Sequence, residues 1–378
     1  MKISTVSRKW LRDGARLTVE LDHCVLNVIP RSASCIQIQA KVSGQAIASR
    51  PGISVINKPE FTDWSVEENS QGLVLTTDEL KLNINGETGQ LSWFDGSGNT
   101  LLREAEGGRK LRTREVKRYR YDASGCVEVV KTVDGERSIG VPVDQYVDRI
   151  ALNYEQQFLI SENEALFGLG QHEEGHFDLR NTRQDLFQAN MKSPMPVVFS
   201  TAGYGLFFDT AAVSGFESKE NALRFWSECS DSLNYYFIHG PGFDEIIRSI
   251  RMLTGDAAML PRWAFGYIQS KERYNTANEL QQVADEFRRR KIPIDCLVQD
   301  WKYWPNNWWG EKSFDPSRFP DPEALLNQLH EQNLKLMISI WPNMRNDGPN
   351  QKTLRDSSLL LGDNSTYDAF SSEARKRY

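Results

Sequence analysis

The spacing of hydrophobic residues changes near residue 240 of this 378-residue chain, and this change constrains the fold more than any other feature. Before it, apolar and polar residues alternate, as in Leu80–Ile84 and Leu91–Trp93, which is typical of strands that bury one face. A turn sequence, Asn85–Gly89, separates these two segments. The pattern predicts a β-sandwich over residues 1–240.

Helical spacing replaces this alternation after residue 240. Phe243, Ile246 and Ile250 recur at intervals of three and four residues, which indicates a helix with one apolar face. We therefore expect residues 241–260 to form a connecting helix and a linker.

Strands and helices then alternate to the end of the chain. Apolar runs predict strands at Trp263–Gln269, Ile294–Val298 and Leu334–Trp341. Between them, helices are expected to start at the capping sequence Asn275–Glu279 and at Asp321. This alternation is typical of a parallel α/β fold. Because a (β/α)8 barrel takes about 250 residues and only about 118 follow Leu260, we expect residues 261–378 to form the first units of an incomplete barrel.

Composition and charge narrow the class of protein. The net charge is −6 and Lys and Arg are scattered outside Arg109–Arg120, so we expect no nucleic-acid partner. That run resembles an exposed strand, and we interpret it as protection of a sheet edge. No segment is apolar for long enough to span a bilayer and none has the pattern of a signal peptide, so we expect no membrane partner. The five cysteines, an odd number without a CxxC pair, favour a reducing compartment and hence a cytoplasmic protein.

The aromatic segment Val298–Gly310 is the best candidate for a functional site. Asp300 is expected at the carboxyl end of a parallel strand, where the functional residues of such folds gather. Tryptophan rings beside a carboxylate suit a sugar, because a sugar ring offers C–H faces for stacking and hydroxyls at its edge. The alternative is a tryptophan-rich loop that packs on the barrel, with Asp300 as a capping residue. The residues alone leave both interpretations open.

Several ordered segments resemble family 31 glycoside hydrolases, with the α-xylosidase branch as the nearest match. In the predicted barrel part these are Phe265–Tyr274, Arg289–Trp304, Phe314–Asp321 and Lys335–Pro342. Upstream, Leu166–Gln171, residues 190–196 and Gly203–Asp209 are similar to the N-terminal sandwich of the family, which is galactose-mutarotase-like. The resemblance thus covers most of the chain.

The resemblance implies a retaining α-glycoside hydrolase that uses one aspartate as nucleophile and another as general acid and base, without a cofactor. It implies an α-xylosidase that releases terminal α-linked xylose from oligosaccharides. An α-glucosidase and a non-catalytic carbohydrate-binding protein remain alternatives. The family's nucleophile motif has no counterpart before Tyr378, so we expect both catalytic aspartates beyond that residue and no activity from this chain alone.

The resemblance also assigns four substrate-binding residues. Asp300 falls where the family has an aspartate that binds sugar hydroxyls in subsite −1, and Trp301 falls at the neighbouring pocket position. Ser339 and Trp341 fall where the family lines the same subsite. They are two residues apart and therefore expected on one face of the third strand.

One short sequence resembles a zinc-binding motif. Residues His172–His176 match the pattern HExxH, in which two histidines one helical turn apart bind zinc. Gly168, Gly170 and Gly175 disfavour a helix there, so we expect no metal site. Asp315 and Asp321, which flank prolines, are interpreted as turn and cap residues.

Overall fold

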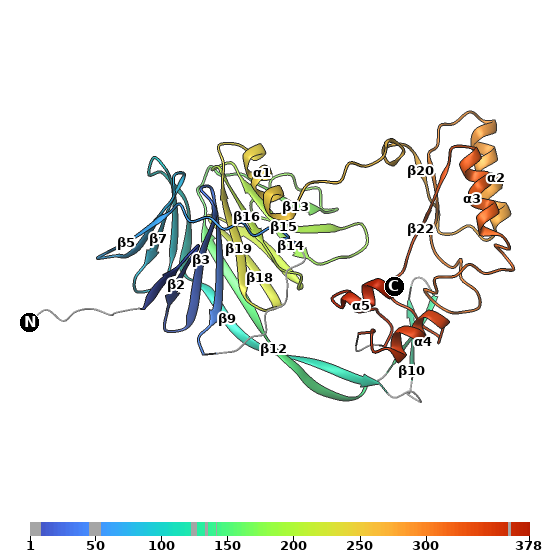
Figure 1. The fold of residues 1–378 in the computed structure, drawn as a ribbon, viewed down its shortest axis with the longest axis horizontal. Helices are drawn as coiled ribbons and strands as arrows, with labels where there is room; N and C mark the ends of the chain where they lie inside the picture. The colour runs from blue at the N-terminus through green and yellow to red at the C-terminus, as the bar shows by residue number, and fades with distance from the viewer. Residues whose placement is uncertain (1–8, 45–53, 122–126, 133–134, 141, 362–363) are drawn as a thin grey trace, which may run out of the picture. The chain divides into compact units, whose positions relative to one another are not determined.

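The computed structural model describes residues 9–44, 54–121, 127–132, 135–140, 142–361 and 364–378. The chain divides into two compact units. The first comprises Met1–Val116 and Val147–Ala257, and the second comprises Lys117–Tyr146 and Ala258–Tyr378. The range predicted as one sandwich, 1–240, therefore includes a segment that belongs to the second unit. Figure 1 labels the helices and strands of both units and colours the chain by residue number.

The first sheet of the first unit has eight strands, and all of its neighbouring strands are antiparallel. In spatial order they are β1 (Trp10–Asp13), β2 (Arg16–Glu20), β3 (Cys24–Ser32), β4 (Cys35–Val42), β19 (Leu233–His239), β16 (Tyr204–Phe208), β15 (Ser193–Ser200) and β13 (Leu166–Gln171). Strands from both ends of the unit's sequence therefore meet, since β4 pairs with β19.

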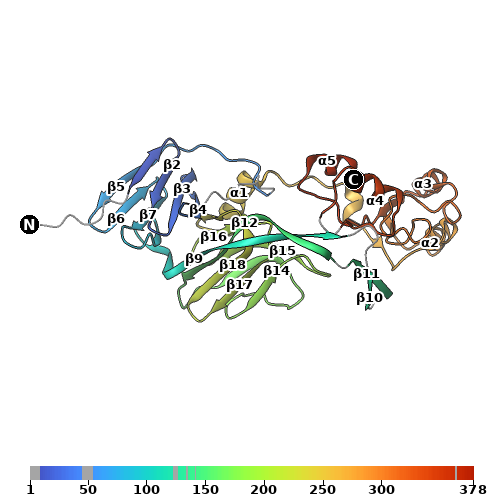
Figure 2. The same ribbon diagram turned by 90° about the horizontal axis from the view of Figure 1, so that it is seen from below.

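The second sheet has nine strands. In spatial order they are β14 (Arg183–Leu186), β17 (Ser214–Lys219), β18 (Ala222–Ser230), β12 (Pro142–Leu159), β9 (Thr100–Tyr121), β8 (Leu91–Asp95), β7 (Leu80–Asn85), β6 (Gly72–Thr76) and β5 (Ser65–Asn69). The two longest strands, β9 and β12, lie side by side (Figure 2).

The basic run Arg109–Arg120 lies within β9, between β8 and β12. Most of the run is exposed, and β9 pairs with β8 over Thr100–Arg103, before the run begins, so its role in edge protection stays a prediction. Arg109 itself is buried and forms an ion pair of 2.5 Å with the buried carboxylate of Glu104. Burial alone would lower the pKa of Arg109, but Glu104 outweighs it and raises that pKa above its ordinary value.

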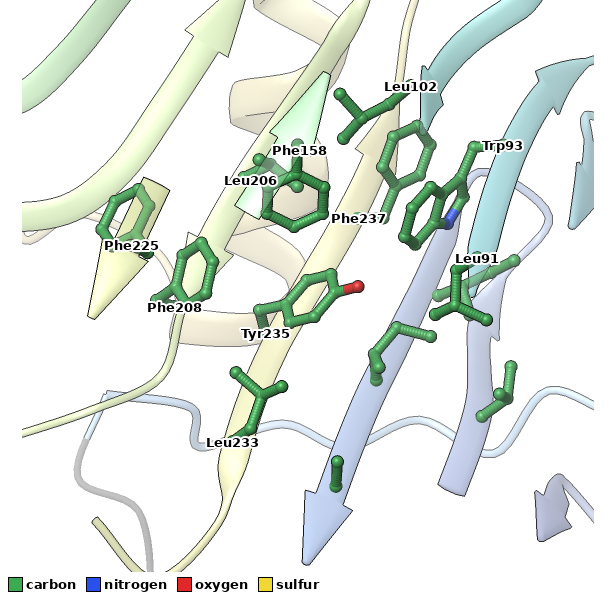
Figure 3. Packing of buried hydrophobic residues seen from close by; sticks show 14 of the residues in the cluster. Leu91, Trp93, Leu102, Phe158, Leu206, Phe208, Phe225, Leu233, Tyr235 and Phe237 are labelled. Atoms are coloured by element: carbon green, nitrogen blue, oxygen red, sulfur yellow. The ribbon is translucent and has the colours of Figure 1, made fainter. Parts of the chain in front are cut away.

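The two sheets pack face to face through one hydrophobic core, so this unit is the predicted β-sandwich. Leu80, Leu82 and Ile84 are buried while the residues between them are exposed, as the alternation predicted. Trp93 of β8 stacks on Phe237 of β19 with ring centroids 5.0 Å apart, which joins the two sheets (Figure 3).

Helix α1 (Phe243–Thr254) belongs to the sandwich unit. Its buried residues Ile246 and Leu253 pack with Ile238 of β19. Gly205 of β16 permits this contact, because a Cβ there would lie 2.6 Å from the Ile246 side chain.

The second unit contains a parallel sheet of three strands, in the order β20 (Ile268–Gln269), β21 (Cys296–Gln299) and β22 (Lys335–Ile338). Helices α2 (Ala277–Arg289) and α3 (Pro322–Glu331) connect these strands, so the unit has the start of the expected barrel. It also contains α4 (Pro349–Asp356), α5 (Ser372–Arg377) and the hairpin of β10 (Val127–Thr132) and β11 (Gly135–Gly140). No helix within the described ranges is long and apolar enough to cross a membrane.

Local signals account for the helix starts of this unit. Thr276 accepts the N–H of Glu279 at 3.1 Å, and the Glu279 carboxylate accepts the N–H of Asn275 at 2.6 Å. This is the predicted capping box, with its return bond one residue earlier than usual. Asp321 caps α3 by accepting the N–H of Ala324 at 2.9 Å.

The first predicted strand of this unit was too long. Within Trp263–Gln269 only the last two residues form a strand, and Arg262–Phe265 form a 3-10 turn. Gly266 then passes so close to Asp295 that a Cβ would lie 1.9 Å from the carboxylate. The close approach explains why a glycine interrupts the run.

Candidate functional site

The neighbouring strands β21 and β22 end at the same edge of the sheet, and each is followed directly by a predicted site residue. In the parallel register Gln299 lies opposite Ile338, and the N–H of Ser339 donates to the Gln299 carbonyl at 3.0 Å. This bond belongs to the Gln299–Ile338 pair, so Asp300 and Ser339 directly follow the last paired position. Both residues therefore leave the sheet at its carboxyl edge, where the loops of such folds form their sites.

Asp300 is half-buried, and its carboxylate forms no hydrogen bond or ion pair with any residue that the structure describes. The hydroxyl of Ser339 also has no partner within the described ranges. The alternative of a capping role finds no support, because the following helix is capped by Asp321 instead. A carboxylate and a hydroxyl that are not used internally can accept hydrogen bonds from a ligand.

Trp309 joins the residues of this region, although only Trp301 and Trp341 were predicted as site residues. Its ring lies 5.6 Å from Trp301, 6.0 Å from Trp304 and 5.2 Å from Trp341. The contact with Trp341 is edge-to-face, at 81°. We call residues 301–310, which follow β21, the aromatic loop. Trp309 therefore connects the aromatic loop to the segment after β22.

Hydrogen bonds from the main chain and from the Trp309 ring fix this connection. The N–H of Arg345 donates to the Trp309 carbonyl at 3.0 Å, and Trp309 Nε1 donates to Asn343 Oδ1 at 3.4 Å. Gly310 adopts a φ of 70°, and a Cβ there would lie 2.1 Å from the Asn343 carbonyl oxygen. Only glycine fits at this position, because both the backbone conformation and the space exclude a side chain.

Trp341 is held through its carbonyl oxygen. Lys312 Nζ and Tyr378 Oη both donate to that oxygen. Burial lowers the pKa of Lys312 to about 8, although nearby Glu311 acts in the opposite direction. Glu311 is buried and accepts the N–H of Asn350 at 3.1 Å, which ties the aromatic loop to the start of α4.

Cationic side chains contact the ring of Trp301. The Arg273 guanidinium lies 5.1 Å from its centroid, and Lys302 Nζ lies 5.9 Å away. Together with Trp309 these contacts fix the orientation of the ring. They also leave less of its surface free for a ligand than the sequence suggested.

The HExxH motif lacks the helix that would place its two histidines on one face. His172–His176 follow β13 in a loop rather than a helix, and His172 Nε2 lies 2.8 Å from the Leu169 carbonyl oxygen. Within the ranges that the structure covers, no group of three or more metal-binding side chains occurs.

Two models of one family match most of the chain. Residues 26–217 match the N-terminal galactose mutarotase-like domain of glycosyl hydrolase family 31, and residues 257–377 match the TIM-barrel domain of the same family. The matches follow the division into a sandwich and a parallel α/β part.

Individual relatives agree with these models. An α-xylosidase of Saccharolobus solfataricus is 36% identical over 235 residues, which are 60% of this chain and 32% of that protein. An uncharacterized family 31 glucosidase of Pseudescherichia vulneris is 26% identical over 325 residues, or 86% of this chain and 59% of that protein. The crystal structure of a family 31 α-xylosidase from a soil metagenome, complexed with xylose, has a TM-score of 0.77 and 25% identity, and the match covers 97% of this chain and 54% of that chain.

The chain thus spans between about a third and three fifths of the length of these relatives. Its two matched regions follow each other in the order of the family's domains. The chain belongs to glycosyl hydrolase family 31, and it contains the N-terminal mutarotase-like domain and the first part of the TIM-barrel domain.

Proposed function

We propose that this chain is part of a retaining α-glycoside hydrolase that releases terminal α-linked xylose from oligosaccharides. The observation that carries the proposal is the position of Asp300 and Ser339 directly after two neighbouring parallel strands, with side-chain oxygens that have no partner among the described residues. The aromatic loop beside them offers ring surface for a sugar. The 36% identity to an α-xylosidase supports xylose as the sugar.

In the proposed reaction, the residues of this chain bind the substrate. The Asp300 carboxylate accepts hydrogen bonds from two sugar hydroxyls, and a charged acceptor makes such bonds stronger than a neutral one. The Ser339 hydroxyl serves as donor or acceptor for a third. Because the double displacement needs two carboxylates about 5–5.5 Å apart, we propose that a pair following Tyr378 performs the bond cleavage. No cofactor takes part.

An α-glucosidase is the second candidate, favoured by the match to a family 31 glucosidase over 86% of this chain. Glucose differs from xylose by one hydroxymethyl group. Exclusion of a group of this size changes transition-state binding by about 1–3 kcal/mol. Relative kcat/KM on aryl α-xyloside and aryl α-glucoside therefore separates the two candidates.

The proposal is tested with a version of the chain that is extended in frame through the remaining barrel strands. Asp300→Ala is expected to lower kcat/KM on aryl α-xyloside at least tenfold, since a buried hydrogen bond to a charged group contributes about 1.5–3 kcal/mol. Asp78→Asn, an exposed change in the turn between β6 and β7, serves as the control. Equal kcat/KM for Asp300→Ala and the control would remove Asp300 from the site. Sugar binding without any hydrolysis would support the non-catalytic alternative.

We also propose that the protein is cytoplasmic. Four of its cysteines, Cys24, Cys35, Cys229 and Cys296, are free, and three of them are buried. Free buried thiols are typical of a reducing compartment. Localisation of a tagged copy by cell fractionation tests this proposal.

A further inference from the structure

Arg318 binds three acceptors in the turn that precedes α3. Its Nε donates to Asp315 Oδ2 at 2.9 Å. Its Nη2 donates to the Trp304 carbonyl at 2.8 Å, and its Nη1 donates to the Asn275 carbonyl at 3.4 Å. The guanidinium is therefore shared between one carboxylate and two main-chain oxygens.

The two carbonyls belong to different loops at the same end of the sheet. Trp304 lies in the aromatic loop, which follows β21, whereas Asn275 lies between β20 and α2. The main chain adds a further tie, because the N–H of Ala277 donates to the Arg318 carbonyl at 3.0 Å. A single residue thus links the loops that follow two neighbouring strands.

Asp315 holds the guanidinium in this place. Its carboxylate accepts the N–H of Ser317 at 2.9 Å and the hydroxyl of Ser317 at 2.6 Å. These bonds, together with Arg318, lower the pKa of Asp315 to about 2, so the carboxylate stays charged at neutral and mildly acidic pH. The N–H of Asp315 also donates to the Tyr303 carbonyl at 2.8 Å. Two successive carbonyls of the aromatic loop, those of Tyr303 and Trp304, are therefore bound by the same turn.

We propose that Arg318 is a positioning residue for the sugar site. By binding the Trp304 carbonyl it fixes Trp304, whose ring contacts Trp309, and through Trp309 it sets the position of Trp301, the residue next to Asp300 in the chain. Lysine cannot replace it, because one ammonium group lacks the planar fork that reaches a carboxylate and two carbonyls at once. The proposal depends on the proposed function in one respect, namely that the aromatic loop binds sugar.

The experiment compares Arg318→Lys with Arg289→Lys. Arg289 is a matched control, since it also pairs with a carboxylate three residues earlier, Glu286, but on the exposed surface of α2. Near-UV circular dichroism of the 378-residue chain reports the packing of the tryptophan rings. In the extended version, kcat/KM on aryl α-xyloside and the thermal midpoint are measured in parallel.

Arg318→Lys is expected to reduce the near-UV tryptophan signal and to lower kcat/KM about 10- to 100-fold, because small displacements of binding groups cost this much. Its thermal midpoint is expected to stay within a few degrees of that of Arg289→Lys, which changes neither the signal nor kcat/KM. An unchanged near-UV signal together with an unchanged kcat/KM for Arg318→Lys would overturn the proposal. A purely structural role would instead lower the midpoint while the folded variant keeps its kcat/KM.

Two further outcomes are separated by design. If the wild-type extended version does not hydrolyse xyloside, the proposed function fails, while the near-UV signal still decides whether Arg318 orders the aromatic loop. If Arg318→Lys does not fold, Ser317→Ala replaces it, because this change removes the 2.6 Å bond that orients Asp315. A smaller loss of the same signal supports the proposal, and an unchanged signal contradicts it.

Discussion

The buried ion pair between Glu104 and Arg109 allows a quantitative test of what stabilises the sandwich. The Glu104 carboxylate binds Arg109 at 2.5 Å and also accepts the Leu91 N–H at 3.1 Å and the Tyr235 hydroxyl at 3.0 Å. Both charged side chains are at least 95% buried. Glu104→Gln keeps one acceptor oxygen, for the Leu91 N–H, and places an amide group that donates to the Tyr235 hydroxyl oxygen. It removes the charge that compensates Arg109.

The expected loss follows from this arrangement. An uncompensated charge in a protein interior costs about 3–5 kcal/mol, so Glu104→Gln should lower the free energy of unfolding of the first unit by that amount. The double change Glu104→Gln with Arg109→Met removes both charges, keeps the bond from the Leu91 N–H and lets the glutamine amide donate to the Tyr235 hydroxyl oxygen. It is expected to lie within about 1 kcal/mol of the wild type, since a buried pair is often no more stabilising than apolar residues of similar volume.

Urea unfolding monitored by circular dichroism measures these differences. Glu217→Gln is the control, because Glu217 and Arg224 form an ion pair of 2.7 Å whose side chains are about one-third exposed. That change should cost no more than about 1 kcal/mol. A loss below about 1 kcal/mol for Glu104→Gln, or a double variant less stable than the single one, would refute the argument that burial decides the value of this pair.

Three further predictions concern other parts of the molecule. Gly310→Ala should destabilise the second unit by about 1–3 kcal/mol and speed proteolysis of the aromatic loop, whereas Gly98→Ala, with a similar φ but no atom within 4 Å, should cost only the backbone strain. Because the pKa of Lys312 is lowered to about 8 in the folded protein, the unfolded state binds more protons above that pH, so stability relative to Lys312→Met should rise between about pH 8 and pH 10; an unchanged difference in urea midpoints would contradict this. Purified protein should contain no stoichiometric zinc, and a chelator should leave its thermal midpoint unchanged; one zinc per chain, lost in His172→Ala, would revive the HExxH motif as a metal site.

Patterns confined to a few neighbouring residues predicted the structure well. The alternation of Leu80, Leu82 and Ile84 identified the buried face of β7, because period two alone decides which side chains share a face. The capping box at Thr276 identified the start of α2, since its hydrogen bonds join residues at most four positions apart. The end of β21 directly before Asp300 agrees with the prediction from similarly local signals.

Features that depend on distant residues were not predicted. The pairing of β9 with β12 was not predicted, because β12 starts twenty or so residues later and has no local signature of its partner. The central position of Trp309 among the rings depends on its contact with Trp341, which follows it in the chain only after α3 and β22. The tryptophans of this loop were visible in the sequence, but nothing in their spacing indicates which ring lies at the centre.

The division of the chain affects how the two units can be separated. The first unit is interrupted by Lys117–Tyr146, which belongs to the second, so the chain passes between the units three times. A single cut at residue 257 therefore cannot yield two independent halves. The upstream fragment would keep a piece of the second unit, attached through β9 and β12, and the downstream fragment would lack it. Removal of residues 1–257 would therefore also remove Lys117–Tyr146 from the second unit. Cleavage of the chain at residue 257 would give two fragments, neither of which corresponds to one complete unit.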